Sequence, residues 1–156
     1  MQDAQVVVIS SAIRDNNVEL VEARRRQIPV IHRSDALVHI MSWGKGISVA
    51  GAHGKTTTSS MLGQVFEECR QDPTIVIGGE VDYLHSNSIL GKGQYVIAEA
   101  DESDGTFLKQ HPYIAVVTNI DADHMDHYNS LDNVIAAFKG IYPETRSRRR
   151  LGRLVF

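Results

Sequence analysis

Cysteine is nearly absent from this chain of 156 residues, which contains a single one, Cys69. An intrachain disulfide is therefore impossible, and the disulfide framework that stabilises many small secreted domains is excluded. The lone thiol falls on the apolar side of an expected helix, where we interpret it as a small buried hydrophobic residue. This cysteine content favours a reducing compartment.

Long hydrophobic runs are missing too. No apolar segment approaches the roughly 20 residues that a helix needs to cross a bilayer, and residues 1–5 lack the basic and apolar regions of a signal peptide. Strong net charge is also absent, since the formal value is −3 at pH 7. We therefore expect a cytoplasmic protein with neither a membrane nor a nucleic acid as a partner.

The sequence does contain an alternation of strand and helix patterns. The expected strands are 6–9, 29–32, 47–50, 74–77, 95–98 and 113–117, and the expected helices are 17–27, 34–42, 56–71 and 130–141. The strand at 6–9 is apolar throughout, as in strands that are buried on both faces. The alternation predicts an α/β fold with a mostly parallel sheet and helices on both faces.

Several local signals refine this prediction. Asn16 or Asn17 and Ser130 have the side chains that cap helix N-termini. In the helix after residue 56, an apolar stripe is expected to face the sheet. The stripe consists of Met61, Leu62, Val65, Phe66 and Cys69. A break at 43–46 predicts a domain junction.

The segment Gly51-Ala52-His53-Gly54-Lys55-Thr56 lies between an expected strand and an expected helix. Backbone N–H groups in such a turn, backed by a helix N-terminus, bind phosphate. The lysine suits β- and γ-phosphate oxygens, and the hydroxyl suits Mg²⁺. Val49 stands where the general pattern has its first glycine, so this loop is a shorter variant. It predicts a site for ATP and Mg²⁺, against the alternative of a glycine-lysine turn without a ligand.

Two further polar segments follow expected strands. Residues 99–104 are rich in carboxylates, and Glu99, the first acid after the strand, is best placed to face a bound nucleotide. The alternative is a solvated acidic loop. Residues 119–127 interleave Asp and His, which are both metal ligands. Because ligands bind beyond the carboxyl ends of parallel strands, we expect these segments to share one site with the loop.

Together these segments resemble the Mur ligases of peptidoglycan synthesis. The resemblance covers roughly residues 4–141, in the family's order and spacing. It is carried by Ser10-Ser11-Ala12-Ile13, residues 48–58, Gly78-Gly79, residues 99–104, and residues 118–126. The Glu-Ser-Asp and Ala-Asp-His-Met-Asp motifs are most similar to the branch of the family that adds L-alanine. The branch that recycles a tripeptide is also similar to this sequence.

The resemblance implies an ATP-dependent ligase that joins L-alanine to the carboxylate of UDP-N-acetylmuramate through an acyl phosphate. It implies that residues 1–43 are the C-terminal part of a UDP-sugar-binding, Rossmann-like domain. Residues 44–142 would then be the N-terminal part of a central, P-loop-type ATPase domain. Residues 143–156, with their five arginines, do not resemble the family's continuation, and we interpret them as an atypical basic tail.

The resemblance also assigns roles to single residues. Lys55, Asn119 and His124 would be catalytic, and Thr56, Glu99 and His124 would hold magnesium. The ATP-binding loop would comprise Gly51, Ala52, His53, Gly54, Lys55, Thr56 and Thr57. UDP-sugar contacts would come from Ser10, Ser11, Ala12, Gly78 and Gly79.

The family's members are considerably longer than this chain, so the resemblance implies a fragment of such an enzyme. Sheet edges that are cut partway expose apolar groups, which would favour self-association. Two other interpretations stay open. One is a nucleotide- or UDP-sugar-binding module without catalysis, and the other is a small P-loop kinase, which would transfer phosphate to a hydroxyl.

Overall fold

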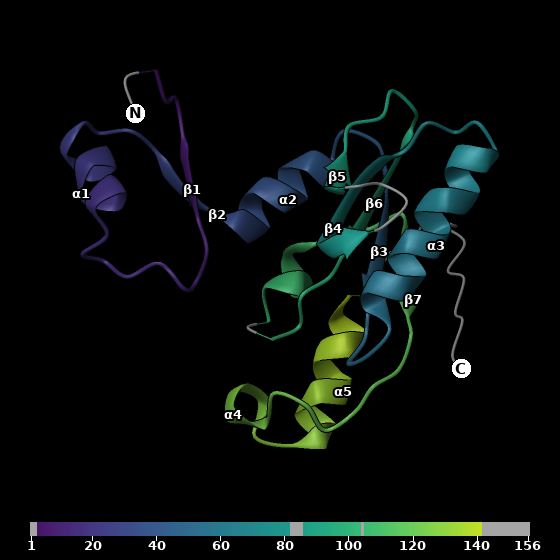
Figure 1. The fold of residues 1–156 in the computed structure, drawn as a ribbon. Coiled ribbons are helices and arrows are strands. Elements are labelled where there is room, and N and C mark those ends of the chain that lie inside the picture. Colours follow the sequence, from purple (N-terminus) through teal and green to yellow (C-terminus); the bar gives the residue numbers. More distant parts are fainter. Residues whose placement is uncertain (1–2, 82–85, 104, 142–156) are drawn as a thin grey trace. The chain divides into compact units, whose positions relative to one another are not determined.

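The computed structural model describes residues 3–81, 86–103 and 105–141 (Figure 1). The expected basic tail at 143–156 and the acid Asp104 lie outside the described residues. The chain divides into two compact units, Met1–Ile40 and Met41–Phe156.

The first unit contains a short βαβ arrangement. It comprises β1 (Val7–Ile9), α1 (Val18–Arg25) and β2 (Val30–His32), and it is followed by α2 (Arg33–Met41). The two strands pair in parallel, with Val7 opposite Val30. The side chain of Asn17 accepts hydrogen bonds from the backbone N–H groups of Glu19 and Leu20, so the expected cap of this helix is confirmed.

The expectation that the first strand is buried on both faces is wrong. Val8 is 49% exposed, and Val6, just before the strand, is also exposed. The strand pairs with β2 alone, and Leu20 and Ala23 of α1 are the buried apolar residues among those described in this unit. So small a unit covers only part of its strand surface.

The second unit is built on a five-stranded sheet with the order β5-β4-β6-β3-β7. Its strands are β3 (Lys45–Ala50), β4 (Thr74–Val81), β5 (Ser86–Ile89), β6 (Tyr95–Glu99) and β7 (Ile114–Val117). All neighbours are parallel except β5, which runs antiparallel to β4. The mostly parallel sheet is confirmed. The sequence did not predict β5, because its Ser-Asn-Ser segment lacks the apolar run of a buried strand.

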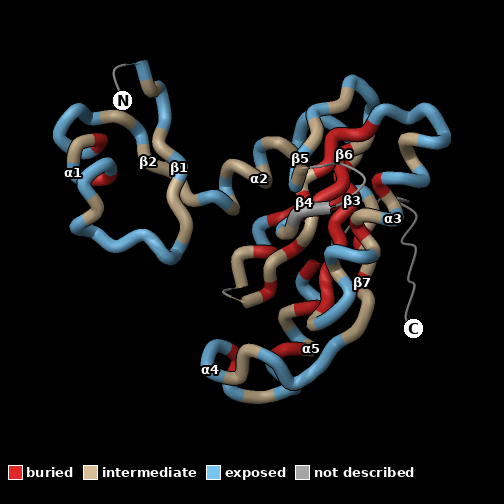
Figure 2. The backbone as a smooth tube through the Cα atoms, viewed as in Figure 1, coloured by how far each residue is buried: buried red, intermediate tan, exposed pale blue. Residues whose placement is uncertain are grey.

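The centre of the sheet is covered on both faces. Consecutive side chains of a strand point to opposite faces, and Ile47 through Ala50 of β3 are all buried (Figure 2). Ser48 is the one polar member of this run, and its hydroxyl donates a hydrogen bond to the buried side chain of Gln110. The polar group is therefore paired, as burial requires.

The helices of the second unit are α3 (Lys55–Glu68), α4 (Met125–Tyr128) and α5 (Leu131–Gly140), together with a 3-10 turn, η2 (Thr106–Lys109). The hydroxyl of Ser130 accepts a hydrogen bond from the backbone of Asn133, which confirms the expected cap of α5. Phe107 of η2 and Phe138 of α5 lie 5.3 Å apart, measured between ring centroids. They form a core with Ala50, Ala100, Ala115, Val117, Tyr128, Val134 and Ile141.

The expected apolar stripe on α3 is largely wrong. Met61 is 63% exposed, Val65 is 56% exposed, and Cys69 is exposed rather than buried. The buried residues of this helix are Ser59 and Gly63. Small residues let a helix approach a sheet closely, so α3 contacts β3, β4 and β6 through a face that hydrophobicity alone does not mark.

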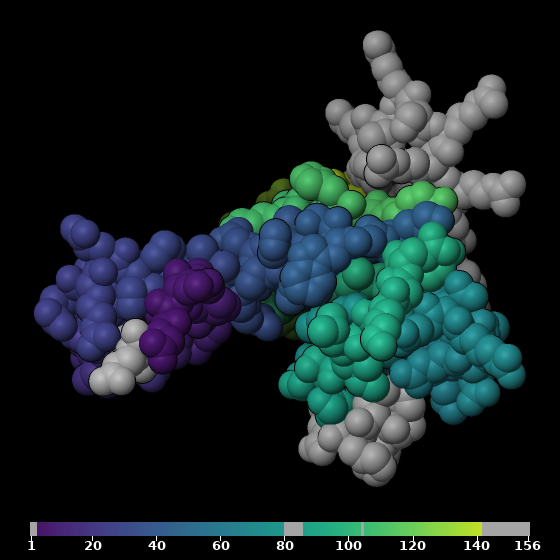
Figure 3. Space-filling model, turned by 90° about the horizontal axis from the view of Figure 1, so that it is seen from above, coloured from purple at the N-terminus to yellow at the C-terminus, as the bar shows by residue number. Residues whose placement is uncertain are grey.

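The loop before β6 is fixed by the segment that follows α3. The backbone N–H of Gly93 donates to the carbonyl of Asp72, and the N–H of Lys92 donates to its carboxylate. Figure 3 shows the surface of this region in teal and green.

Within the part of the chain that the structure describes, no helix has the length and apolar character needed to span a bilayer.

Truncating Phe138 to alanine should lower the free energy of unfolding by about 3–5 kcal/mol, since the ring is fully buried and a cavity would remain. Urea unfolding monitored by circular dichroism measures this change. Leu131→Ala on the same helix is the control, because Leu131 is 44% exposed. Surface changes of this kind alter stability by about 0.5 kcal/mol or less. Equal effects of the two substitutions would contradict this assignment of the core.

A second prediction concerns Glu22 on α1. Hydrogen bonds from the guanidinium groups of Arg25 and Arg26 lower the pKa of Glu22 from 4.5 to about 2. The folded pKa lies below the unfolded one, so this contribution to stability is present above pH 4.5 and is lost as the pH falls through about 2. Carboxyl ¹³C shifts measured against pH should give the low midpoint, and Arg25→Gln should raise it.

Candidate functional site

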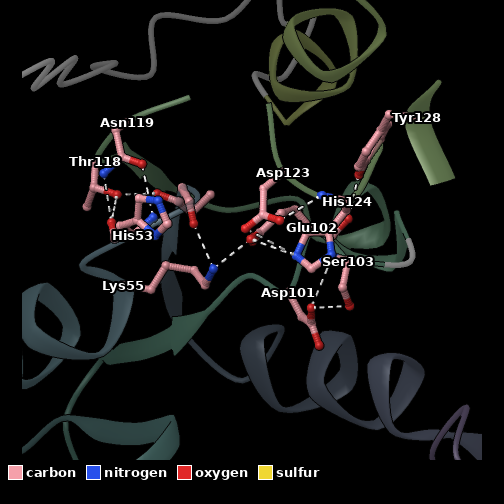
Figure 4. Close-up of polar contacts among 12 residues, drawn as sticks. His53, Lys55, Asp101, Glu102, Ser103, Thr118, Asn119, Asp123, His124 and Tyr128 are labelled. Atoms are coloured by element: carbon pink, nitrogen blue, oxygen red, sulfur yellow. Dashed lines mark hydrogen bonds and ion pairs between the residues drawn. The ribbon is translucent and has the colours of Figure 1, made fainter. Parts of the chain in front are cut away.

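Three polar segments meet at one edge of the second unit's sheet. In parallel strands the carboxyl ends lie at the same edge, and β3 lies between β6 and β7. Val49 pairs with Glu99 and Ala50 pairs with Val117, so the three strands end side by side. The segments that follow them supply the side chains drawn in Figure 4.

The turn after β3 has the backbone that a close approach requires. Gly51 has a φ of 139°, and a Cβ there would collide with the hydroxyl of Thr118. Gly54 has a φ of 77° and caps the N-terminus of α3, and no described atom lies within 4 Å of the position that its Cβ would occupy. The turn therefore leaves open space in front of a helix N-terminus, where the helix dipole favours an anion.

The turn is held in place from β7. The side-chain N–H of Asn119 donates to the backbone carbonyl of His53 at 2.9 Å, and the backbone N–H of His53 donates back to the side-chain oxygen Oδ1 of Asn119 at 3.0 Å. The Thr118 hydroxyl donates to the same His53 carbonyl at 2.7 Å. The imidazole of His53 is exposed, so this residue acts in the turn through its backbone.

Lys55 begins α3 and turns back over the loop. Its Nζ donates to the carbonyl of Gly51 at 2.7 Å and to Oε1 of Glu102 at 2.7 Å (Figure 4). The side chain of Glu102 is only 5% exposed, against 20% for Lys55. An ion pair shielded in this way is screened less by salt than a surface pair. The cation thus lies at the mouth of the loop, fixed by two acceptors.

Glu102 also lies near His124, so it connects Lys55 to the segment after β7. The distance from Oε1 of Glu102 to Nε2 of His124 is 3.8 Å. The backbone of Glu102 is held by Tyr128, whose hydroxyl donates to its carbonyl at 2.5 Å. His124 itself has a left-handed backbone, with a φ of 53°, at the start of α4.

Sequence reasoning missed Glu102. It favoured Glu99 because that residue directly follows the strand, yet the carboxylate that pairs with Lys55 comes three residues later. The available signal was that Glu102 belongs to the same acidic run. Choosing between the two acids required the path of the turn after β6, which brings Glu102 back toward α3.

Glu99 faces β4 instead. A Cβ at Gly78 would lie 2.8 Å from Oε2 of Glu99, and a Cβ at Gly79 would lie 3.6 Å from the methyl group of Thr56. Glu99 and Thr56 therefore flank the same pair of glycines. Oε1 of Glu99 is buried without a hydrogen-bond partner among the described residues, which leaves a carboxylate oxygen available to a ligand.

These oxygen donors fit magnesium. Mg²⁺ binds through one or two protein groups together with phosphates and waters, and the Thr56 hydroxyl with the Glu99 carboxylate is such a set. The described residues contain no group of three or more His, Cys, Asp or Glu side chains that could hold a metal ion by itself. His124 contacts Glu102 and Asp123, and no measured contact joins it to Thr56 or Glu99.

The other expected site residues are distributed as follows. Ala52 lies within the turn, and Thr57 is exposed in the first turn of α3. Ser10, Ser11 and Ala12 belong to the first unit, where the Ser11 hydroxyl lies 3.1 Å from Nε2 of His32. The second unit thus brings together the loop, Asn119, Lys55 and His124, whereas the serines form a separate group in the first unit.

Comparison with known proteins identifies the family. A profile described as the Mur ligase middle domain matches residues 49–151, and one described as the Mur ligase family, catalytic domain, matches residues 1–43. A UDP-N-acetylmuramate–L-alanine ligase from Pelotomaculum thermopropionicum is 57% identical over 137 residues, which is 88% of this chain and 30% of that protein.

Solved structures agree with these matches. The UDP-N-acetylmuramate–alanine ligase of Thermotoga maritima superposes with a TM-score of 0.81 at 34% identity, covering 89% of this chain and 33% of that one. The UDP-N-acetylmuramate:L-alanyl-γ-D-glutamyl-meso-diaminopimelate ligase of Neisseria meningitides gives a TM-score of 0.75 at 25% identity, covering 94% and 53%. The chain spans about 30% of the curated relative described above. With a profile covering most of its length, this chain belongs to the Mur ligase family.

Proposed function

We propose that this chain forms the ATP-binding part, and the end of the UDP-sugar-binding part, of a ligase that joins L-alanine to UDP-N-acetylmuramate. The observation that carries the proposal is the Lys55 ammonium group, fixed over an open glycine turn at the N-terminus of α3. High identity to a named UDP-N-acetylmuramate–L-alanine ligase supports the choice of substrates. Residues 1–43 would belong to the sugar-nucleotide domain and residues 44–142 to the ATPase domain.

The reaction proceeds through an acyl phosphate. A carboxylate oxygen of UDP-N-acetylmuramate attacks the γ-phosphorus of ATP, the bond from that phosphorus to the β,γ-bridging oxygen breaks, and ADP leaves. The amine nitrogen of L-alanine then attacks the acyl carbon and loses a proton to solvent. The tetrahedral intermediate expels inorganic phosphate and leaves the amide. This reaction requires two anionic reactants, ATP and UDP-N-acetylmuramate, to be held together. Positioning and charge neutralisation therefore dominate catalysis.

The residues at the carboxyl ends of β3, β6 and β7 suit this positioning and charge neutralisation. Lys55 neutralises the β- and γ-phosphates, the turn at 51–54 surrounds the phosphate chain, and Asn119 keeps that turn in shape through His53. Thr56 and Glu99 would hold Mg²⁺, which neutralises phosphate charge when it is bound. His124 lies at the same edge, close to the acceptor carboxylate. In the first unit, Ser10, Ser11 and Ala12 would contact the sugar nucleotide. In the second unit, Gly78-Gly79 of β4 would let a substrate approach the backbone.

Lys55→Ala should weaken binding of ATP and Mg²⁺ to this chain by about 10- to 100-fold, the usual effect of losing a hydrogen bond between charged groups. Isothermal titration calorimetry with the purified chain measures the affinity. The control is Lys92→Ala, which removes an exposed lysine from the loop before β6. Similar losses in both variants, or none in Lys55→Ala, would exclude the proposed phosphate site.

Glu99→Gln should reduce the gain in ATP affinity that Mg²⁺ provides by about tenfold, as is typical when a group supporting a bound metal is lost. ATP affinity measured in EDTA should stay the same or rise, because a negative charge near the phosphates is removed. Titrations with and without Mg²⁺ separate the two effects. Glu68→Gln, at the exposed far end of α3, is the control. An unchanged magnesium dependence in Glu99→Gln would remove this residue from the metal site.

Whether this chain's residues support the ligase reaction can be tested in a chimaera. The corresponding 137 residues of the Pelotomaculum ligase are replaced by this chain's residues, and ADP release is followed with each substrate omitted in turn. We expect ADP only when ATP, UDP-N-acetylmuramate and L-alanine are all present. ATP binding without ADP formation would favour a binding module that lacks catalysis.

A further inference from the structure

The carboxylate of Glu102 has two oxygens in different situations. Oε1 accepts a hydrogen bond from Lys55 at 2.7 Å and lies 3.8 Å from His124. Oε2 is buried and has no hydrogen-bond partner among the described residues. A buried anion with one unsatisfied oxygen costs free energy unless a cation compensates it. The ammonium group of Lys55 is the cation that contacts Glu102 in this structure.

That arrangement conflicts with the role proposed for Lys55. A lysine that serves the β- and γ-phosphates must direct its ammonium group at the ligand, yet here it is paired with a nearly buried carboxylate. Incoming phosphate therefore competes with Glu102 for the same cation, and the two anions repel each other in a site that is screened only weakly. The pair holds Lys55 in place before the nucleotide arrives, and it lowers the affinity for the nucleotide.

His124 gives Glu102 a second partner. Its Nε2 is within 4 Å of Oε1, and the backbone of Glu102 is fixed by the hydroxyl of Tyr128. When phosphate draws Lys55 away, the carboxylate stays in place and the imidazole is the nearest group that can compensate it. Asp123, 4.0 Å from the same Nε2, is the other acid facing this ring, and it is half exposed.

We propose that Glu102 is a positioning residue that exchanges its partner when nucleotide binds. It holds Lys55 over the phosphate loop, releases it to the β- and γ-phosphates, and then orients His124 at the edge where the acceptor carboxylate is activated. This inference rests on the proposed function, because it requires a polyphosphate in the loop. Glu102, which the sequence did not single out, would then link nucleotide binding to the segment that contains His124.

The test uses Glu102→Gln in the whole 156-residue chain. This variant keeps the shape of the side chain and removes its charge. ATP with Mg²⁺, and separately inorganic triphosphate, should bind about 5- to 10-fold more tightly than to the wild type, because the competing anion is gone. The unliganded variant should melt at a lower temperature, since Lys55 has lost its ion pair. If the role of Glu102 were purely structural, Glu102→Gln would lower both the melting temperature and the affinity for ATP.

The proposed exchange of partners can be followed directly at His124 by NMR. In the wild type, ATP should shift the imidazole ¹H and ¹⁵N resonances of His124, and in Glu102→Gln this shift should largely disappear. Asp121→Asn is the matched control. Asp121 is an exposed acid near the same loop, 3.9 Å from the imidazole of His53, and it does not contact Lys55. Its loss should change ATP affinity less than about twofold, because exposed charges are screened.

The outcomes separate this inference from the proposed function. If neither wild type nor Glu102→Gln binds ATP or triphosphate, both proposals fall. If the wild type binds but Glu102→Gln binds equally or more weakly, only the role of Glu102 is overturned. If Glu102→Gln does not fold, Glu102→Ala replaces it, because it also removes the competing anion. A several-fold tightening is again expected, and an unchanged or weaker affinity again rejects the proposal.

Discussion

The parallel pairing of β3 with β6 on one side and with β7 on the other is the constraint on which the site depends. The register aligns Val49 with Glu99 and Ala50 with Val117, so three chain segments leave the sheet at one level. These segments are far apart in sequence, and each is polar immediately after its strand. A shift of β3 by one residue would turn every side chain to the opposite face. It would take the buried hydroxyl of Ser48 away from Gln110, its hydrogen-bond partner.

Within that frame, close backbone approach matters as much as side-chain chemistry. Gly51 leaves room for the hydroxyl of Thr118, and Gly78 leaves room for the carboxylate of Glu99. Ser59 and Gly63 let α3 lie close to the sheet, which fixes where its N-terminus meets the turn. A larger side chain at any of these positions would displace the loop relative to the strand ends, even though none of them is charged.

Most polar groups described at this edge have partners within the protein. Lys55 is paired with Glu102, and the backbone of His53 is held by Asn119. The unpartnered buried oxygens of Glu99 and Glu102 are the exceptions among the described residues of the sheet edge. Buried acceptors without partners are uncommon in folded proteins. Their presence among the residues that follow β6 agrees with the cation binding that we propose for this edge.

The sequence by itself determined the α/β class, the glycine turn between β3 and α3, and the helix starts after Asn17 and Ser130, because strand runs, glycine turns and caps are local features. Only the tertiary structure decided that α3 buries Ser59 and Gly63 while exposing Met61 and Val65. It also decided that the acid paired with Lys55 is Glu102. Such contacts join residues far apart in the chain, and they depend on how turns bring them together, which neither spacing nor composition records.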